Sequence, residues 1–143
     1  MEARVVGGVI RVRAPGRMPE AELRRHVETL VARLERRQHA EAIDIEARAA
    51  TLAARFRLPR PASVRWVDNQ GGRWGSCTPW EGAVRVSSRL AAFPPWVVDY
   101  VLVHELAHLA EGGHGPRFWA LVNRYPKAER ARGYLMAKGM DEG

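Results

Sequence analysis

The chain has 143 residues, of which 46% are hydrophobic and 27% are charged, and its net charge is +7. These values are typical of one globular domain and do not indicate a disordered chain. The only cysteine, Cys77, excludes an intrachain disulfide and a thiolate-rich metal site. The sequence has neither an apolar run of the ~20 residues that span a bilayer nor the pattern of a signal peptide. We therefore expect a cytoplasmic protein without a membrane partner.

The positive charge is concentrated in the N-terminal half. Residues 1–60 contain thirteen basic and eight acidic residues, whereas residues 61–143 contain ten and eight. A basic surface attracts polyanions, so the N-terminal half is a candidate for binding nucleic acid. A solvated, arginine-rich helix surface explains the same composition.

The first 60 residues predict a strand followed by a long basic helical region. Residues 5–12 are rich in β-branched side chains that alternate weakly with other residues, which indicates a strand. Apolar side chains then recur at three- and four-residue spacing from residue 19 to 57. This spacing predicts one helix, or two helices with a bend near Gln38 and His39. The prolines at 59 and 61 end the helical pattern, and residues 61–143 are expected to form the core of the same single domain.

The C-terminal part predicts a small sheet followed by helices. Residues 63–67, 73–76 and 83–87 read as short strands joined by turn-rich segments, which favours a mainly antiparallel three-stranded sheet. Helices are predicted over about 95–111, 116–124 and 127–138. The expected fold class is therefore α+β, with the sheet packed against a central helix and flanking helices.

The helix predicted over 95–111 carries the pattern H-E-x-x-H. His104 and His108 are four residues apart and lie on one face, with Cβ atoms ~5–6 Å from each other, so both imidazoles can bind one ion. Glu105 is turned by ~100° from His104 and is placed to reach a water on that ion. The helix is apolar on nearly every face and is therefore expected to be buried. Because unpartnered polar groups there cost several kcal/mol, the pattern predicts a metal.

Two residues compete to be the third ligand. Gly112 and Gly113 break the helix and allow the chain to bring His114 back over it. Glu111 lies two turns after His104 and is the alternative; otherwise it is expected to orient a ligand from outside the coordination sphere. Three histidines leave the fourth position to water, which is the open geometry of a catalytic site, and these ligand types favour one Zn²⁺ ion.

The chain resembles the YgjP-like metallopeptidases, which are relatives of the SprT-like proteases. The resemblance covers about residues 60–135. It is carried by Arg73-Trp74-Gly75-Ser76-Cys77, Val84-Arg85-Val86, Arg89-Leu90, Pro94-Pro95, Val98-Asp99-Tyr100-Val101, His104-Glu105-Leu106-Ala107-His108-Leu109 and His114-Gly115-Pro116-Arg117-Phe118-Trp119. It implies a minimal zincin-like fold and a third ligand at His114.

The resemblance also implies a mechanism, which is zinc-dependent hydrolysis of peptide bonds with Glu105 as the general base. Substrate is expected to pair with an edge strand, for which we predict residues 83–87, with Val84, Arg85 and Val86 at its centre. The sequence does not identify the group that stabilises the oxyanion. The candidates are Arg73, Tyr100, Tyr125 and Tyr134.

Two other functions compete with this prediction. SprT-like relatives act on proteins attached to DNA, so the chain is alternatively a DNA-associated protease or a nucleic-acid-docking protein. A non-catalytic, zinc-stabilised interaction domain is the second alternative. It predicts a closed site with Glu111 or Cys77 as a fourth ligand. It does not explain why Glu105 is present, because a structural metal site needs no general base.

Overall fold

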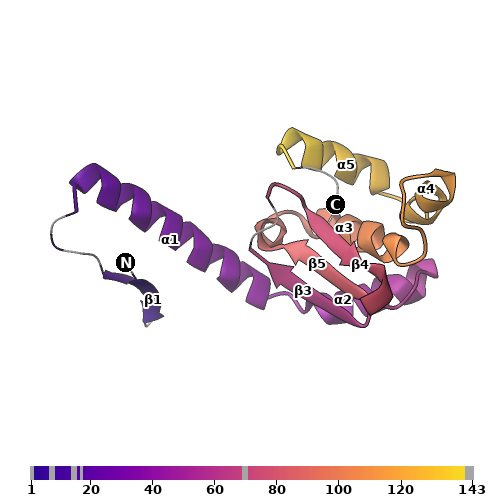
Figure 1. Ribbon diagram of the computed structural model, residues 1–143, viewed down its shortest axis with the longest axis horizontal. Coiled ribbons are helices and arrows are strands. Elements are labelled where there is room, and N and C mark those ends of the chain that lie inside the picture. The colour runs from indigo at the N-terminus through magenta and orange to yellow at the C-terminus, as the bar shows by residue number, and fades with distance from the viewer. Residues whose placement is uncertain (1, 7–8, 14–15, 17, 69–70, 141–143) are drawn as a thin grey trace. The chain divides into compact units, whose positions relative to one another are not determined.

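A computed structural model describes residues 2–6, 9–13, 16, 18–68 and 71–140, with side chains from residue 16 onward (Figure 1). The chain divides into two compact units, residues 1–42 and residues 43–143. The site predicted from the sequence lies entirely within the second unit.

The first unit contains a strand pair and one long helix. The predicted strand over residues 5–12 is an antiparallel pair of strands, β1 (Glu2–Val6) and β2 (Val9–Arg13), in which Val6 pairs with Val9. Helix α1 (Glu20–Glu41) follows, and residues 42–44 separate it from the next helix. The helical pattern of residues 19–57 therefore forms two helices.

The second unit begins with helix α2 (Ile45–Phe56), whose two ends are capped. The Asp44 side chain accepts a hydrogen bond from the backbone N–H of Ala47 at 3.0 Å, which satisfies one of the free N–H groups of the first turn. Arg57 ends the helix in a left-handed conformation with φ +54°, and its N–H bonds to the carbonyl of Ala53. The chain then enters β3 (Ser63–Val67), β4 (Gly75–Thr78), the 3-10 helix η1 (Pro79–Glu81), β5 (Ala83–Ser87) and the 3-10 helix η2 (Ser88–Ala92).

The three-stranded sheet is mixed, and its spatial order is β3-β5-β4. Strand β5 is parallel to β3 and antiparallel to β4, so the prediction of a mainly antiparallel sheet missed one of the two pairings. The reason is that β3 and β4 are not neighbours in the sheet, and β5 fills the position between them. Strand β5 is consequently central. The prediction that Val84, Arg85 and Val86 form an edge strand is wrong, because β4 lies at the edge instead.

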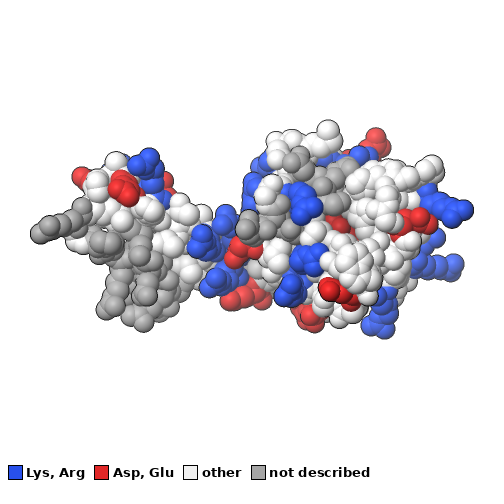
Figure 2. Space-filling model, in the orientation of Figure 1, with Lys and Arg blue, Asp and Glu red and all other residues white. Residues whose placement is uncertain are grey.

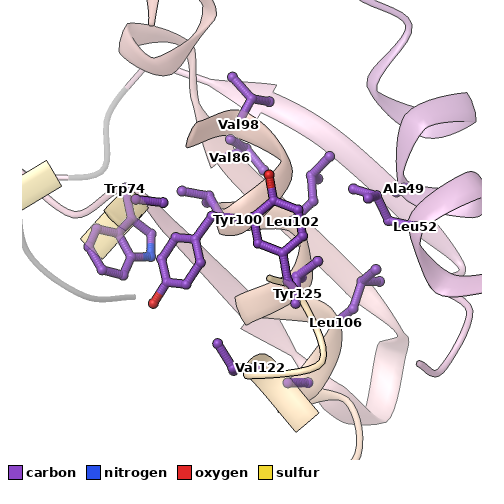
Figure 3. Packing of buried hydrophobic residues seen from close by; sticks show 14 of the residues in the cluster. Ala49, Leu52, Trp74, Val86, Val98, Tyr100, Leu102, Leu106, Val122 and Tyr125 are labelled. Atoms are coloured by element: carbon purple, nitrogen blue, oxygen red, sulfur yellow. The ribbon is translucent and has the colours of Figure 1, made fainter. Parts of the chain in front are cut away.

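Helix α3 (Pro95–His108) is the centre of the second unit. Twelve of its fourteen residues are buried, and it contacts α2, β4, β5, α4 (Pro116–Val122) and α5 (Ala128–Ala137). Figure 3 shows the apolar core that surrounds it, with Leu52 from α2 and Val86 from β5 among the packed side chains. Arg48 of α2 adds a charged contact, since it donates two hydrogen bonds to the buried carboxylate of Asp99 on α3. The expected central helix is confirmed.

Across the described part of the chain, no helix combines the length and the apolar character needed to cross a bilayer.

Candidate active site

Three imidazoles meet beside the C-terminal end of α3. His104 and His108 come from successive turns of the helix, and the segment 109–115 brings His114 back toward them. One ligand nitrogen of each ring lies within 4.8 Å of the others, and the Nε2 atoms of His108 and His114 are 3.0 Å apart. Nitrogens bound tetrahedrally to one zinc ion at about 2.1 Å are about 3.4 Å from each other. The three rings therefore suit a single metal ion.

Neighbouring groups orient two of these rings. His108 Nδ1 lies 3.1 Å from the main-chain carbonyl oxygen of Glu111. Because a carbonyl only accepts, Nδ1 carries the hydrogen and Nε2 keeps its lone pair for a metal. The hydroxyl of Tyr100 lies 3.4 Å from Nδ1 of His104, and the ring of Phe118 stacks on His108 with centroids 4.3 Å apart. Glu111 thus contacts a predicted ligand through its backbone.

The side chain of Glu105 is fully buried next to the histidines. Neither carboxylate oxygen has a hydrogen-bond partner among the residues that the structure describes. Burial raises the pKa of Glu105 to about 8, while the positive charges of Arg73 and Arg85 oppose this rise. Burying a carboxylate without a partner costs free energy. A metal ion with its water would supply the positive charge and the hydrogen-bond donor that the carboxylate lacks. This unpartnered carboxylate beside three nitrogen donors fits a catalytic metal.

Strand β4 approaches Glu105 so closely that a side chain at residue 75 would meet the carboxylate. A Cβ atom added to Gly75 would lie 2.9 Å from Oε2 of Glu105 and 3.0 Å from the backbone oxygen of Arg85. Real Cβ atoms essentially never come that close, so a side chain there would displace the carboxylate or the sheet. In the sequence Gly75 stood out only as part of the family motif, so this role was missed. Its position in a strand pattern is a signal of close approach that was available.

Glu105 and two of the histidines face a cavity of about 270 Å³ that β4 borders. Burial raises the pKa of the Cys77 thiol in its wall to about 11, so the thiol stays protonated at neutral pH. Within the described residues, the group that can hold a metal comprises the three histidines and includes neither Cys77 nor the carboxylate of Glu111. The cavity is lined by Arg73, Ser76, Cys77, Pro79, Glu105, His108, Gly112 and His114.

The four candidates for oxyanion stabilisation lie in different places. Arg73 lines the cavity. Tyr100 is buried beside His104, the hydroxyl of Tyr125 donates to the backbone oxygen of Trp96 at 2.9 Å, and Tyr134 packs edge-on against the rings of Trp96 and Phe93. The structure therefore brings Arg73 to the cavity and places Tyr125 and Tyr134 in contacts elsewhere.

Aromatic rings pack against the three histidine rings. Trp74 is fully buried and meets His104 edge-on with centroids 5.3 Å apart, and Figure 3 shows its indole nitrogen directed toward the ring of Tyr100. Phe118 packs against all three histidine rings, and Trp119 lies beside His114. These contacts limit the rotation of the imidazole rings. The sequence alone did not single out Phe118 for this role.

Comparison with known proteins agrees with this geometry. An α+β fold that carries H-E-x-x-H on a buried central helix, with a third histidine folded back beside it, defines a metallopeptidase. The sequence model described as "YgjP-like, metallopeptidase domain" matches residues 26–138, and the chain belongs to this family. It acts on peptide or protein substrates and requires a metal ion. No protein of curated function matches the sequence significantly.

Two solved structures show the same fold. One is the metallopeptidase zymogen abylysin of Pyrococcus abyssi, with 21% identity and a TM-score of 0.58 over 66% of this chain and 93% of that chain. The other is the metallopeptidase zymogen jannalysin of Methanocaldococcus jannaschii, with 15% identity and a TM-score of 0.57 over 67% of this chain and 97% of that chain. The predicted family, fold class and type of enzyme are confirmed.

Proposed function

We propose that this metallopeptidase holds one Zn²⁺ ion with His104, His108 and His114, and that Glu105 is its general base. The observation that carries the proposal is the unpartnered, buried carboxylate of Glu105 beside three converging imidazoles. Three neutral nitrogen donors with one open position are typical of catalytic zinc. When bound, zinc lowers the pKa of a water molecule and polarises the scissile carbonyl.

The side chains of the cavity supply the rest of the reaction. A carboxylate oxygen of Glu105 takes the proton from the attacking water and passes it to the nitrogen of the leaving amine. Burial keeps this oxygen away from bulk water, which favours retention of the proton between the two transfers. Arg73 lines the same cavity and is our candidate for stabilising the negative charge that develops on the carbonyl oxygen.

We further propose that the substrate pairs with β4. This strand lies at the edge of the sheet, and its residues Ser76 and Cys77 line the cavity together with Glu105. An extended peptide that adds to an edge strand gains backbone hydrogen bonds at every second residue. Strand β4 therefore replaces β5 as the proposed edge for substrate.

Metal analysis and a cleavage screen test the proposal together. Purified wild-type protein is expected to contain about one zinc ion per chain and to cleave members of a mixed peptide library. Glu105→Gln is expected to keep the metal and lose cleavage, because the amide cannot accept the proton. His104→Ala is expected to lose both.

Glu111→Gln is the matched control, since it also changes a carboxylate to an amide near the site but leaves the backbone carbonyl that contacts His108. This variant is expected to keep both metal and activity. A Glu105→Gln protein that cleaves peptides as fast as the wild type would refute the assigned base. Zinc binding that survives loss of His114 would refute the assigned third ligand.

Binding of nucleic acid through the basic N-terminal half stays an untested prediction.

A further inference from the structure

Arg85 belongs to the central strand, but its side chain reaches over β4, which is an edge strand of the sheet. Its Nε donates a hydrogen bond to Ser76 Oγ at 2.9 Å, and its Nη2 donates to Thr78 Oγ1 at 2.7 Å. Ser76 pairs with Arg85 in register, and Ser76 and Thr78 lie on the same face of β4 because strand side chains alternate. The guanidinium is therefore held above β4, one strand nearer to the free edge than its own Cα atom.

The two hydroxyls hold the guanidinium without neutralising its charge. They occupy two of the five N–H donors that an arginine side chain carries. Within the part of the chain that the structure describes, salt bridges involve Arg24, His26 and Arg48, and Arg85 forms none. A partly buried cation with free donors favours an anionic partner.

The surroundings of Arg85 are also positive. Arg65 of β3 pairs with Arg85 in register, so both arginine side chains leave the sheet on its outer face. Between residues 58 and 90 the sequence has five arginines and two acidic residues, and one of these acids, Asp68, already accepts a hydrogen bond from Ser88. Figure 2 shows basic side chains over the sheet, which faces the viewer in Figure 1.

We propose that Arg85 selects substrates with an Asp or Glu side chain on the outer face of the peptide segment that pairs with β4. The inference rests on the proposed function, because it needs a peptide on that strand. An added strand lies about 4.8 Å from β4, and every second side chain projects on the face that carries Ser76 and Thr78. A carboxylate there meets a guanidinium already positioned by two hydroxyls, so little side-chain freedom is lost on binding.

Paired peptides test this inference. A neutral peptide cleaved in the library screen is resynthesised with Glu, and separately with Gln, at each position around the scissile bond. We expect kcat/KM to favour Glu over Gln about tenfold at one position, or at two positions two residues apart, as a hydrogen bond to a charged group implies. The preference is expected to shrink between about 0.05 M and 0.5 M salt, because exposed charges are screened.

Two variants identify the residue responsible. Arg85→Gln is expected to bring the Glu/Gln ratio close to one, while Arg85→Lys retains part of the preference. Arg65→Gln is the matched control, because it removes a neighbouring charge that is one strand farther from the free edge, and it is expected to keep most of the preference. Thermal unfolding of each variant separates a loss of selectivity from a loss of fold.

The outcomes distinguish this inference from the proposed function. Equal cleavage of Glu and Gln peptides at every position, or a preference that survives in Arg85→Gln, overturns the role of Arg85 and leaves the peptidase assignment intact. If no peptide is cleaved, the proposed function fails, and fluorescence anisotropy of labelled Glu and Gln peptides with the wild-type protein still decides the inference. Equal affinities in that measurement refute it, and tighter binding of the Glu peptide that Arg85→Gln abolishes supports it.

Discussion

The buried carboxylate of Glu105 makes the metal-free protein less stable as pH rises. Its ordinary pKa is 4.5, and burial raises the pKa in the folded state to about 8. Between these values the unfolded chain releases the proton while the folded chain keeps it. The stabilising contribution is therefore complete below pH 4.5 and is lost as pH rises toward 8. The substitution Glu105→Gln removes this loss, because the amide is neutral at every pH.

The size of this change in stability follows from the shift in the pKa of Glu105. Each pH unit within the window changes the free energy of unfolding by about 1.4 kcal/mol. Between pH 5 and pH 8, the metal-free Gln variant is therefore expected to gain about 3 kcal/mol relative to the metal-free wild type. Every other ionisable group is common to both proteins, so the difference between their free energies of unfolding is the informative quantity.

Urea unfolding of chelator-treated protein, followed by tryptophan fluorescence at several pH values, measures this difference. The same change at the exposed Glu81 controls for the type of substitution. Adding zinc is expected to flatten the pH dependence of the wild type, because the positive ion compensates the carboxylate. A difference between wild type and Gln variant that is constant from pH 5 to pH 8 would show that Glu105 is not held in an apolar environment, and the reasoning would fail.

Three further predictions concern residues that position the site. Gly75→Ala is expected to lower both kcat and the free energy of unfolding, the latter by about 1–3 kcal/mol, because its Cβ meets Glu105 at 2.9 Å; wild-type activity in this variant would contradict the close approach. Arg48→Ala is expected to destabilise the protein by about 2–4 kcal/mol in urea unfolding, because it leaves the Asp99 carboxylate buried without its partner, and a double variant that also has Asp99→Ala should recover part of the loss. Burial raises the pKa of Tyr125 to about 12, so the stability provided by its neutral phenol is lost as pH rises from 10 to 12. Tyr125→Phe should cost about 1 kcal/mol at neutral pH through the lost hydrogen bond to Trp96 and should weaken that alkaline loss; identical alkaline melting curves would count against it.

The sequence by itself identified the chemical groups of the candidate site. The spacing of His104, Glu105 and His108 on an apolar helix is a local property, because a helix places residues four apart on one face whatever surrounds it. The double glycine before His114 likewise predicts a local turn. Both expectations needed only the geometry of a single helix and its end, and the structure brings these histidines together.

Only the tertiary structure decided which strand lies beside the site. The patterns of β4 and β5 are both short and similar, and strand order depends on the path of a connection that leaves no periodic signal in the sequence. The observed strand order makes β5 central, moves the proposed substrate edge to β4, and lets the side chain of Arg85 reach over β4. Long-range packing also decided three further features, because each depends on segments that are distant in the chain. These are the burial of Glu105, its close approach to Gly75, and the placement of Arg73, but not Tyr125 or Tyr134, at the cavity.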